Sequence, residues 1–275
     1  MGYETIEITP MTPRIGAEVS GIDLTESLGN QQFQELHDAL MEHSVLFFRN
    51  QDVDVEQHKN FGRLFGDLHI HPGSPPPPGH PEILIVHADK DSKHIAGENW
   101  HSDVTCDAEP PMGSILHLWE VPESGGDTLF ASMEAAYDDL SERMKIYLDG
   151  LNATHSGEQI YRGRYNNQKH DDTNVTYPRN VHPVVRTHPV TGRKSIFVNK
   201  TFTTHINEIP KAESDSVLAF LYSHCAKPDY QVRFKWQPHS IAFWDNRCVQ
   251  HLALWDYYPQ VRSGYRVTVK GDKPF

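Results

Sequence analysis

Cysteine is scarce in this chain, with three residues of that type among 275. An odd number of cysteines without a Cys-x-x-Cys spacing argues against a framework of disulfide bonds. We therefore expect reduced thiols, as is typical of the cytosol, that pack in the interior: Cys106, Cys225 and Cys248.

Runs of basic residues and long apolar stretches are also missing. The formal net charge is −12, whereas surfaces that bind nucleic acids need clustered Lys and Arg. The longest apolar runs, such as Val45-Leu46-Phe47-Phe48, are far too short to cross a bilayer. The first residues lack the basic region and the apolar stretch of a signal peptide. We expect a cytoplasmic protein with neither a nucleic acid nor a membrane as partner.

Short strands separated by Gly and Pro turns dominate the pattern that is present. Residues 231–236 and 265–270 alternate between apolar and polar side chains, which is typical of a half-buried strand. Because the strand-helix rhythm of parallel sheets is absent, we expect a mainly β fold, an antiparallel sandwich or jelly roll with peripheral helices. Apolar residues at helical spacing predict those helices at residues 30–43, 55–65, 132–151 and 211–224.

The length and the hydrophobic fraction of 37% suit one large domain, residues 1–275. Residues 155–181 are polar and irregular, rich in Asn, Gln, Asp, Arg and Tyr. Long polar insertions inside compact domains are usually functional. We therefore predict a lid-like insertion around 155–181.

Histidine is abundant, with 18 residues, and the spacing His-x-Asp recurs. Two side chains of that spacing share one face of a strand, and with a remote histidine they can form the facial triad that holds non-haem Fe(II). The candidate remote partner is His251. Spacing alone does not show which of three His-x-Asp pairs binds a metal, and a fourth pair has Glu in place of Asp. The pairs are His101/Asp103, His87/Asp89, His170/Asp172 and His80/Glu82.

Two arginines, Arg262 and Arg266, follow His251 in the chain. On an extended strand both guanidinium groups project from the same face, roughly 13 Å apart at about 3.3 Å per residue. Two arginines that face one cleft are costly unless they meet anions. The pair therefore favours two anionic ligands or one dianion, and surface arginines on an exposed strand are the alternative.

Several separated motifs, in this order, resemble the taurine dioxygenase (TauD/TfdA) family of Fe(II)/2-oxoglutarate oxygenases. The resemblance covers nearly the whole chain, and only His101/Asp103 falls at the position of the family's His-x-Asp pair. The motifs are Trp100-His101-Ser102-Asp103-Val104-Thr105, Gly125-Gly126-Asp127-Thr128, residues 182–189, Trp244-Asp245-Asn246-Arg247 leading to His251, Arg262 with Arg266, and Gly271-Asp272-Lys273-Pro274.

The resemblance implies a double-stranded β-helix core of the cupin type, and three co-reactants: Fe(II), 2-oxoglutarate and molecular oxygen (O2). It also implies that the protein forms a homo-oligomer, a dimer or a tetramer. The roles carried over are iron ligation by His101, Asp103 and His251, binding of the distal carboxylate of 2-oxoglutarate by Arg262 and Thr128, and binding of the anionic substrate by His71, Tyr161 and Arg266.

The resemblance makes a taurine-like organosulfonate the first choice of substrate, with release of sulfite and an aldehyde. The family's tyrosine near His71 stands here as Ser74, and an asparagine before the iron motif stands as Gly97. Residues 155–161 resemble the branch that cleaves aryloxyalkanoates. An aryloxyalkanoate, another carboxylate or an alkyl sulfate thus remains the alternative. A non-catalytic cupin-like binding module is disfavoured because it needs no such full set of ligands with Arg262 and Thr128.

Overall fold

The computed structural model describes residues 2–71, 76–95, 97–162 and 176–275. Its strands are β1 (Glu7–Pro10), β2 (Ala17–Ser20), β3 (Val45–Phe48), β4 (Ile83–Ala88), β5 (Gly113–Glu120), β6 (Thr128–Ser132), β7 (Asn152–Ser156), β8 (Arg179–Pro183), β9 (Val185–Thr187), β10 (Lys194–Ile196), β11 (Thr203–Ile206), β12 (Gln231–Phe234), β13 (Ser240–Asp245), β14 (Val249–Ala253) and β15 (Arg262–Val269). Its helices are α1 (Asn30–His43), α2 (Val55–Arg63), α3 (Met133–Asp138), α4 (Glu142–Leu148), α5 (Glu158–Tyr161), α6 (Lys211–Cys225) and the 3-10 helix η2 (Pro228–Tyr230).

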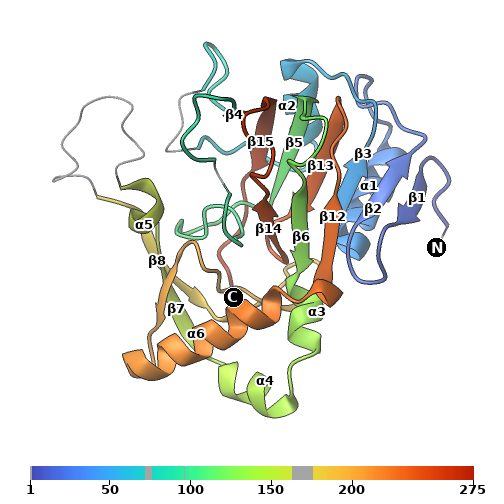
Figure 1. Cartoon of the computed structure of the whole chain (residues 1–275). Helices are drawn as coiled ribbons and strands as arrows, with labels where there is room; N and C mark the ends of the chain where they lie inside the picture. Colours follow the sequence, from blue (N-terminus) through green and yellow to red (C-terminus); the bar gives the residue numbers. More distant parts are fainter. Residues whose placement is uncertain (1, 72–75, 96, 163–175) are drawn as a thin grey trace.

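Two sheets form the centre of the molecule (Figure 1). The major sheet has the strand order β1-β2-β3-β13-β5-β15-β4, and all its pairs are antiparallel except β2 with β3. The minor sheet has the order β12-β6-β14 and is antiparallel. The two sheets pack against each other through a buried cluster that includes Phe47, Phe130, Phe234 and Trp244. This arrangement is the jelly-roll sandwich that the strand pattern predicts.

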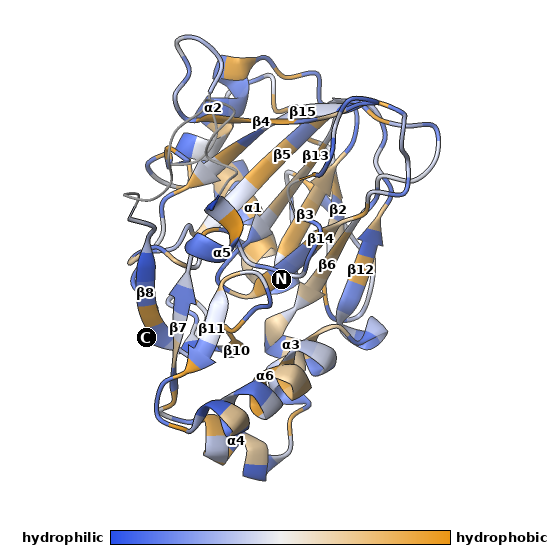
Figure 2. Cartoon of the chain, turned by 60° about the vertical axis from the view of Figure 1, so that its left-hand side comes forward, coloured by the Kyte–Doolittle hydropathy of each residue, from blue (hydrophilic) through white to orange (hydrophobic). Residues whose placement is uncertain are grey.

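The four apolar residues of β3 show how the layers stack. Val45 and Phe47 belong to the cluster between the sheets, whereas Leu46 and Phe48 belong to the cluster under α1 and α2. Alternate side chains of a strand point to opposite faces, and both faces of β3 are covered. Figure 2 shows hydrophobic residues along β5 and β13 as well.

A smaller layer lies beside the sandwich, where β7, β8 and β11 form a three-stranded sheet and α6 packs on β11 (Figure 1). Its core includes Ala153 of β7, Ile206 of β11 and Leu221 of α6. The predicted helix over 132–151 is wrong as one element, because the structure has α3 and α4 there. Ser141 begins α4 by accepting a hydrogen bond from the Met144 backbone at 3.2 Å, as a capping serine does.

The predicted insertion at 155–181 begins inside β7 and ends inside β8. Residues 163–175 lie outside the described residues, so both the lid and the single domain of residues 1–275 stay predictions. No helix in the described part of the chain is long and apolar enough to span a membrane.

Candidate active site

Three metal-capable side chains meet at the edge of the minor sheet. The ligand atoms of His101, Asp103 and His251 all lie within 4.8 Å of one another, and all three residues are buried. His251 sits on β14, and its backbone exchanges two hydrogen bonds with His101, of 2.8 and 3.1 Å. The two imidazole centroids are 4.1 Å apart.

The expectation that His101 and Asp103 share one face of a strand is wrong. His101 makes a single β-bridge to His251, after which the chain turns. Val104 has a φ of 48°, a left-handed conformation that β-branched residues rarely adopt. The turn, rather than strand alternation, brings the Asp103 carboxylate to the imidazoles, with 3.7 Å between His101 Nε2 and Asp103 Oδ1.

The protonation states suit a divalent metal. Burial would raise the pKa of Asp103, but Arg266 and the two histidines outweigh it and hold that pKa well below its ordinary value. Burial lowers the pKa of His101 and, more strongly, that of His251. Near pH 7 the three residues therefore present one carboxylate and two neutral imidazoles.

Hydrogen bonding leaves ring nitrogens available for a metal. His101 Nδ1 donates to the carbonyl oxygen of Asn99 at 2.8 Å, so Nε2 keeps its lone pair. His251 Nδ1 is buried without a hydrogen-bond partner among the described residues. Two imidazoles and one carboxylate are the donor set of non-haem Fe(II) sites with open positions, so these residues fit that ion.

Of the other candidate pairs, the two that the structure describes gather no such set. His87 and Asp89 form a partly exposed pair, with 3.4 Å between Nε2 and Oδ2. His80 lies 3.4 Å from a carboxylate oxygen of Glu56 instead of joining a ligand cluster. His170 and Asp172 lie outside the described residues.

A second buried group in the described part of the chain comprises His188, Asp245 and Cys248. Arg247 occupies both Asp245 carboxylate oxygens, at 2.8 Å from Nε and 2.6 Å from a terminal nitrogen. His188 Nε2 donates to the same carboxylate at 3.1 Å. Burial raises the pKa of Cys248 well above its ordinary value, so the thiol stays protonated. This group is an internal ion pair rather than a metal site.

Arg262 is a buried cation without an ion pair among the residues that the structure describes. It lies at the start of β15 and donates from Nε to the Gly126 carbonyl at 3.2 Å and from a terminal nitrogen to Thr128 Oγ1 at 3.3 Å. Its guanidinium carbon lies 5.5 Å from the centroid of the Trp236 ring. Burial lowers the pKa of Arg262 to about 10. Such a group favours an anionic ligand.

Arg266 is on the same strand, as predicted, and reaches the metal cluster. Its Nη1 donates to Asp103 Oδ1 at 2.8 Å. His71 belongs to the same surroundings, because burial and the charge of Arg266 lower its pKa to about 4. The His71 ring packs edge-on against Tyr161, with 6.2 Å between centroids. The structure therefore brings Arg266, His71 and Tyr161 to one side of the cluster.

An apolar wall adjoins this side. It is a buried cluster formed by Val104, Cys106, Tyr161, Tyr177 and Phe202. Burial raises the pKa of Cys106 to about 12, so its thiol stays neutral. A pocket of about 400 Å³ lined by residues 69–70, Asp107 and 176–178 opens beside it.

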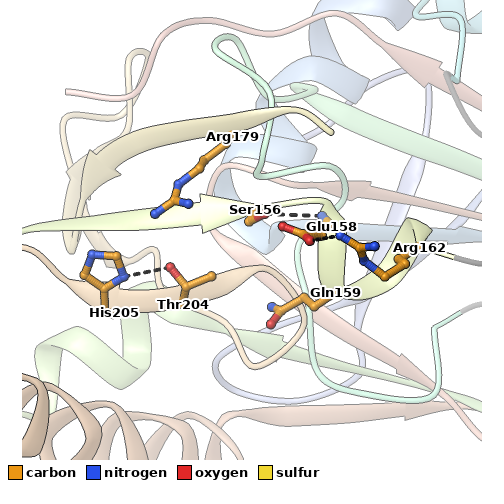
Figure 3. A pocket seen from close by; sticks show the side chains of 7 residues that line it. All are labelled: Ser156, Glu158, Gln159, Arg162, Arg179, Thr204 and His205. Atoms are coloured by element: carbon orange, nitrogen blue, oxygen red, sulfur yellow. Dashed lines mark hydrogen bonds and ion pairs between the residues drawn. The ribbon is translucent and has the colours of Figure 1, made fainter. Parts of the chain in front are cut away.

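A different pocket, of about 490 Å³, lies between β7, β8, β11 and α5 (Figure 3). Its lining is polar and partly self-paired, since Glu158 accepts from Arg162 and His205 bonds to Thr204. None of the predicted site residues lines it. The position of this pocket therefore does not indicate where His101, Asp103 and His251 lie.

Sequence analysis missed two contributors. Trp236 donates from its indole nitrogen to Thr128 Oγ1 at 3.0 Å, and Ser114 donates to the second oxygen of Asp103 at 2.8 Å. Trp236 lies in the segment predicted as a strand at 231–236, and Ser114 lies on β5. A strand pattern alone does not distinguish them from ordinary core residues.

Comparisons with known proteins identify the family of the chain. The chain is 35% identical to an alpha-ketoglutarate-dependent sulfonate dioxygenase of Saccharomyces cerevisiae, over 98% of this chain and 68% of the yeast protein. It is 38% identical to an alkylsulfatase of Acinetobacter baylyi, over 98% of this chain and 86% of that protein. The crystal structure of a taurine dioxygenase from Burkholderia xenovorans superposes with a TM-score of 0.85 at 34% identity, covering 98% of this chain and 91% of that one. The family model described as taurine catabolism dioxygenase TauD, TfdA family matches residues 7–268, and the chain belongs to that family.

Proposed function

We propose that this protein is an Fe(II)- and 2-oxoglutarate-dependent dioxygenase that oxidises a small organosulfonate to an aldehyde and sulfite. The observation that carries the proposal is a buried cation, Arg262, that finds no carboxylate in the described part of the protein. It lies on the same strand as Arg266, which contacts the cluster of His101, Asp103 and His251. A group of three metal-capable side chains and the cation of Arg262, unpaired among the described residues, suit a ligand that chelates the metal and ends in a carboxylate.

His101, Asp103 and His251 would hold the iron. Bound Fe(II) would supply the activation of O2 that is coupled to the decarboxylation of 2-oxoglutarate to succinate. Three protein ligands leave positions for the 2-oxoacid and for oxygen. The buried surroundings of these residues exclude bulk water from the reacting atoms.

Arg262 and Thr128 would bind the distal carboxylate of 2-oxoglutarate. The planar guanidinium matches a carboxylate in a bidentate arrangement. Thr128 Oγ1 already accepts from Trp236 and from Arg262, so its own proton remains available to donate. Ligand binding would thus satisfy a buried charge that otherwise only polar neutral groups contact.

Arg266 and His71 would bind the anionic group of the substrate. At pH 7 His71 is neutral, since burial lowers its pKa to about 4, so Arg266 supplies the positive charge of this pair. Tyr161 and the apolar wall would pack against the carbon chain. This combination supports an organic anion with an apolar body.

The proposed reaction is hydroxylation of the carbon that bears the sulfonate. One oxygen atom of O2 enters the C–H bond and the other enters succinate, while 2-oxoglutarate loses CO2. The α-hydroxysulfonate then breaks its C–S bond to give an aldehyde and sulfite. Similarity to an alkylsulfatase favours an alkyl sulfate as the second candidate, whose hydroxylated carbon breaks its C–O bond to give an aldehyde and sulfate.

A substrate panel tests the proposal. Fe(II)-loaded protein with 2-oxoglutarate is offered pentanesulfonate, taurine, pentyl sulfate and phenoxyacetate, and succinate, sulfite and sulfate are measured, with His251→Ala as the inactive control. Succinate and sulfite in equal amounts from a sulfonate are expected. Equal amounts of succinate and sulfate, or stimulation by the carboxylate alone, would reject the sulfonate assignment.

The predicted homo-oligomer, a dimer or a tetramer, and the cytoplasmic location rest on the family resemblance and on composition, and they stay predictions.

A further inference from the structure

Asp103 uses its two carboxylate oxygens differently. Oδ1 lies 3.7 Å from His101 Nε2 and accepts from Arg266 at 2.8 Å. Oδ2 accepts from the hydroxyl of Ser114 at 2.8 Å. Ser114 is the second residue of β5 and is fully buried.

Asn246 closes a ring of hydrogen bonds around this carboxylate. The Asp103 backbone N–H donates to Asn246 Oδ1 at 3.2 Å, and Asn246 Nδ2 donates to Ser114 Oγ at 3.1 Å. Trp244 Nε1 donates to the same Asn246 oxygen at 2.9 Å, which fixes the amide orientation. The ring links the turn after His101 to β5 and to the segment between β13 and β14, all of it buried.

This ring of hydrogen bonds fixes which group is the donor in each bond. Because Asn246 Nδ2 is a donor, Ser114 Oγ accepts from it and directs its own proton to Asp103 Oδ2. Rotation of the carboxylate toward the metal side would leave that buried proton only the hydroxyl of Thr268, at 3.4 Å from Ser114 Oγ, which is a weaker partner than the carboxylate. Oδ2 thus holds the Ser114 hydroxyl, whereas Oδ1, which accepts from Arg266, is the oxygen placed 3.7 Å from His101 Nε2.

We propose that Ser114, oriented by Asn246, is a positioning residue that makes Asp103 bind the metal through Oδ1 alone. The inference rests on the proposed metal site. It goes beyond that site because it assigns a role to Ser114, which is not a metal ligand. A carboxylate held to one oxygen leaves one more coordination position open than a carboxylate that binds through both. Partners of ligating carboxylates commonly set metal affinity in this way.

Ser114→Ala tests the inference with a readout other than turnover. Titration calorimetry with Co(II) under anaerobic conditions should show affinity about 10- to 100-fold weaker than in the wild type. The d–d absorption band of bound Co(II) should also shift, since the released carboxylate can bind through both oxygens. Ser114→Thr keeps a hydroxyl donor and should restore most of the affinity and the original band.

Ser214→Ala is the matched control. Ser214 is also fully buried and its hydroxyl oxygen accepts from the Ile206 backbone at 2.9 Å, on α6 and outside the metal cluster. Both alanine variants should lower the midpoint of thermal unfolding, but only Ser114→Ala should lose Co(II) affinity. Wild-type affinity and spectrum in a folded Ser114→Ala protein would overturn the inference. Failure of the wild type itself to bind Co(II) more tightly than His251→Ala would instead overturn the proposed metal site.

Discussion

Replacing Arg262 by Met should have opposite effects on the ligand-free protein and on 2-oxoglutarate binding. The side chain is buried, and its contacts are the Gly126 carbonyl, the Thr128 hydroxyl and the Trp236 ring. Met fills a comparable volume without a charge and adapts to irregular sites. The substitution therefore removes the cation while it keeps much of the packing.

The magnitudes follow from these contacts. A pKa that burial lowers from 12.5 to about 10 corresponds to about 3 kcal/mol of unfavourable energy for the charged form. Loss of the two hydrogen bonds costs about 2 kcal/mol. The free energy of unfolding of the ligand-free variant should thus stay unchanged or rise by about 1 kcal/mol. Binding of 2-oxoglutarate should weaken by about 2–5 kcal/mol, a factor of about 30 to a few thousand.

Urea unfolding of the ligand-free protein and anaerobic calorimetry of 2-oxoglutarate with the Mn(II)-loaded protein measure the two quantities. Arg186 gives the matched control, because it is equally buried but pairs with Asp272 at 2.9 Å. Arg186→Met should lose stability and leave 2-oxoglutarate affinity unchanged. A destabilised Arg262→Met with wild-type 2-oxoglutarate affinity would refute the reasoning and make Arg262 a structural residue.

Two further predictions concern substrate binding and pH. Arg266→Gln should raise the KM for the anionic substrate by at least about 30-fold, while 2-oxoglutarate affinity stays near that of the wild type. Steady-state kinetics measure both quantities. The reverse pattern would exchange the roles of Arg262 and Arg266. Acid should destabilise the metal-free protein, because burial lowers the pKa of His58 and of His155 to about 3. Between pH 6.5 and that value the unfolded chain binds protons that the folded chain does not, so stability falls as pH falls. Urea midpoints from pH 7 to 4 should show this slope, and His58→Gln should flatten it; an unchanged slope in that variant would count against His58.

Local patterns predicted most of the elements. Residues 30–43 match α1, and the alternation at 265–270 correctly marks β15, although that strand begins earlier, at Arg262. Predicted boundaries failed where a side chain acts on the backbone. Ser141 divides one expected helix into two. Periodicity reports which faces are apolar and is blind to such single hydrogen bonds.

The sequence by itself determined the class of protein: a mainly β chain without basic runs, long apolar runs or Cys-x-x-Cys spacings, carrying spaced motifs that resemble one oxygenase family. The family resemblance selected His101/Asp103 among the His-x-Asp pairs, and the tertiary structure shows how this pair meets His251. The bridge between His101 and His251 joins residues far apart in the chain, and sheet pairing, which no local pattern encodes, sets that contact. The turn at Val104, the lack of an ion pair for Arg262 among the described residues and the hydrogen-bond ring around Asp103 are likewise properties of packing. Each depends on which buried groups find partners, and that is settled when the sheets close on each other.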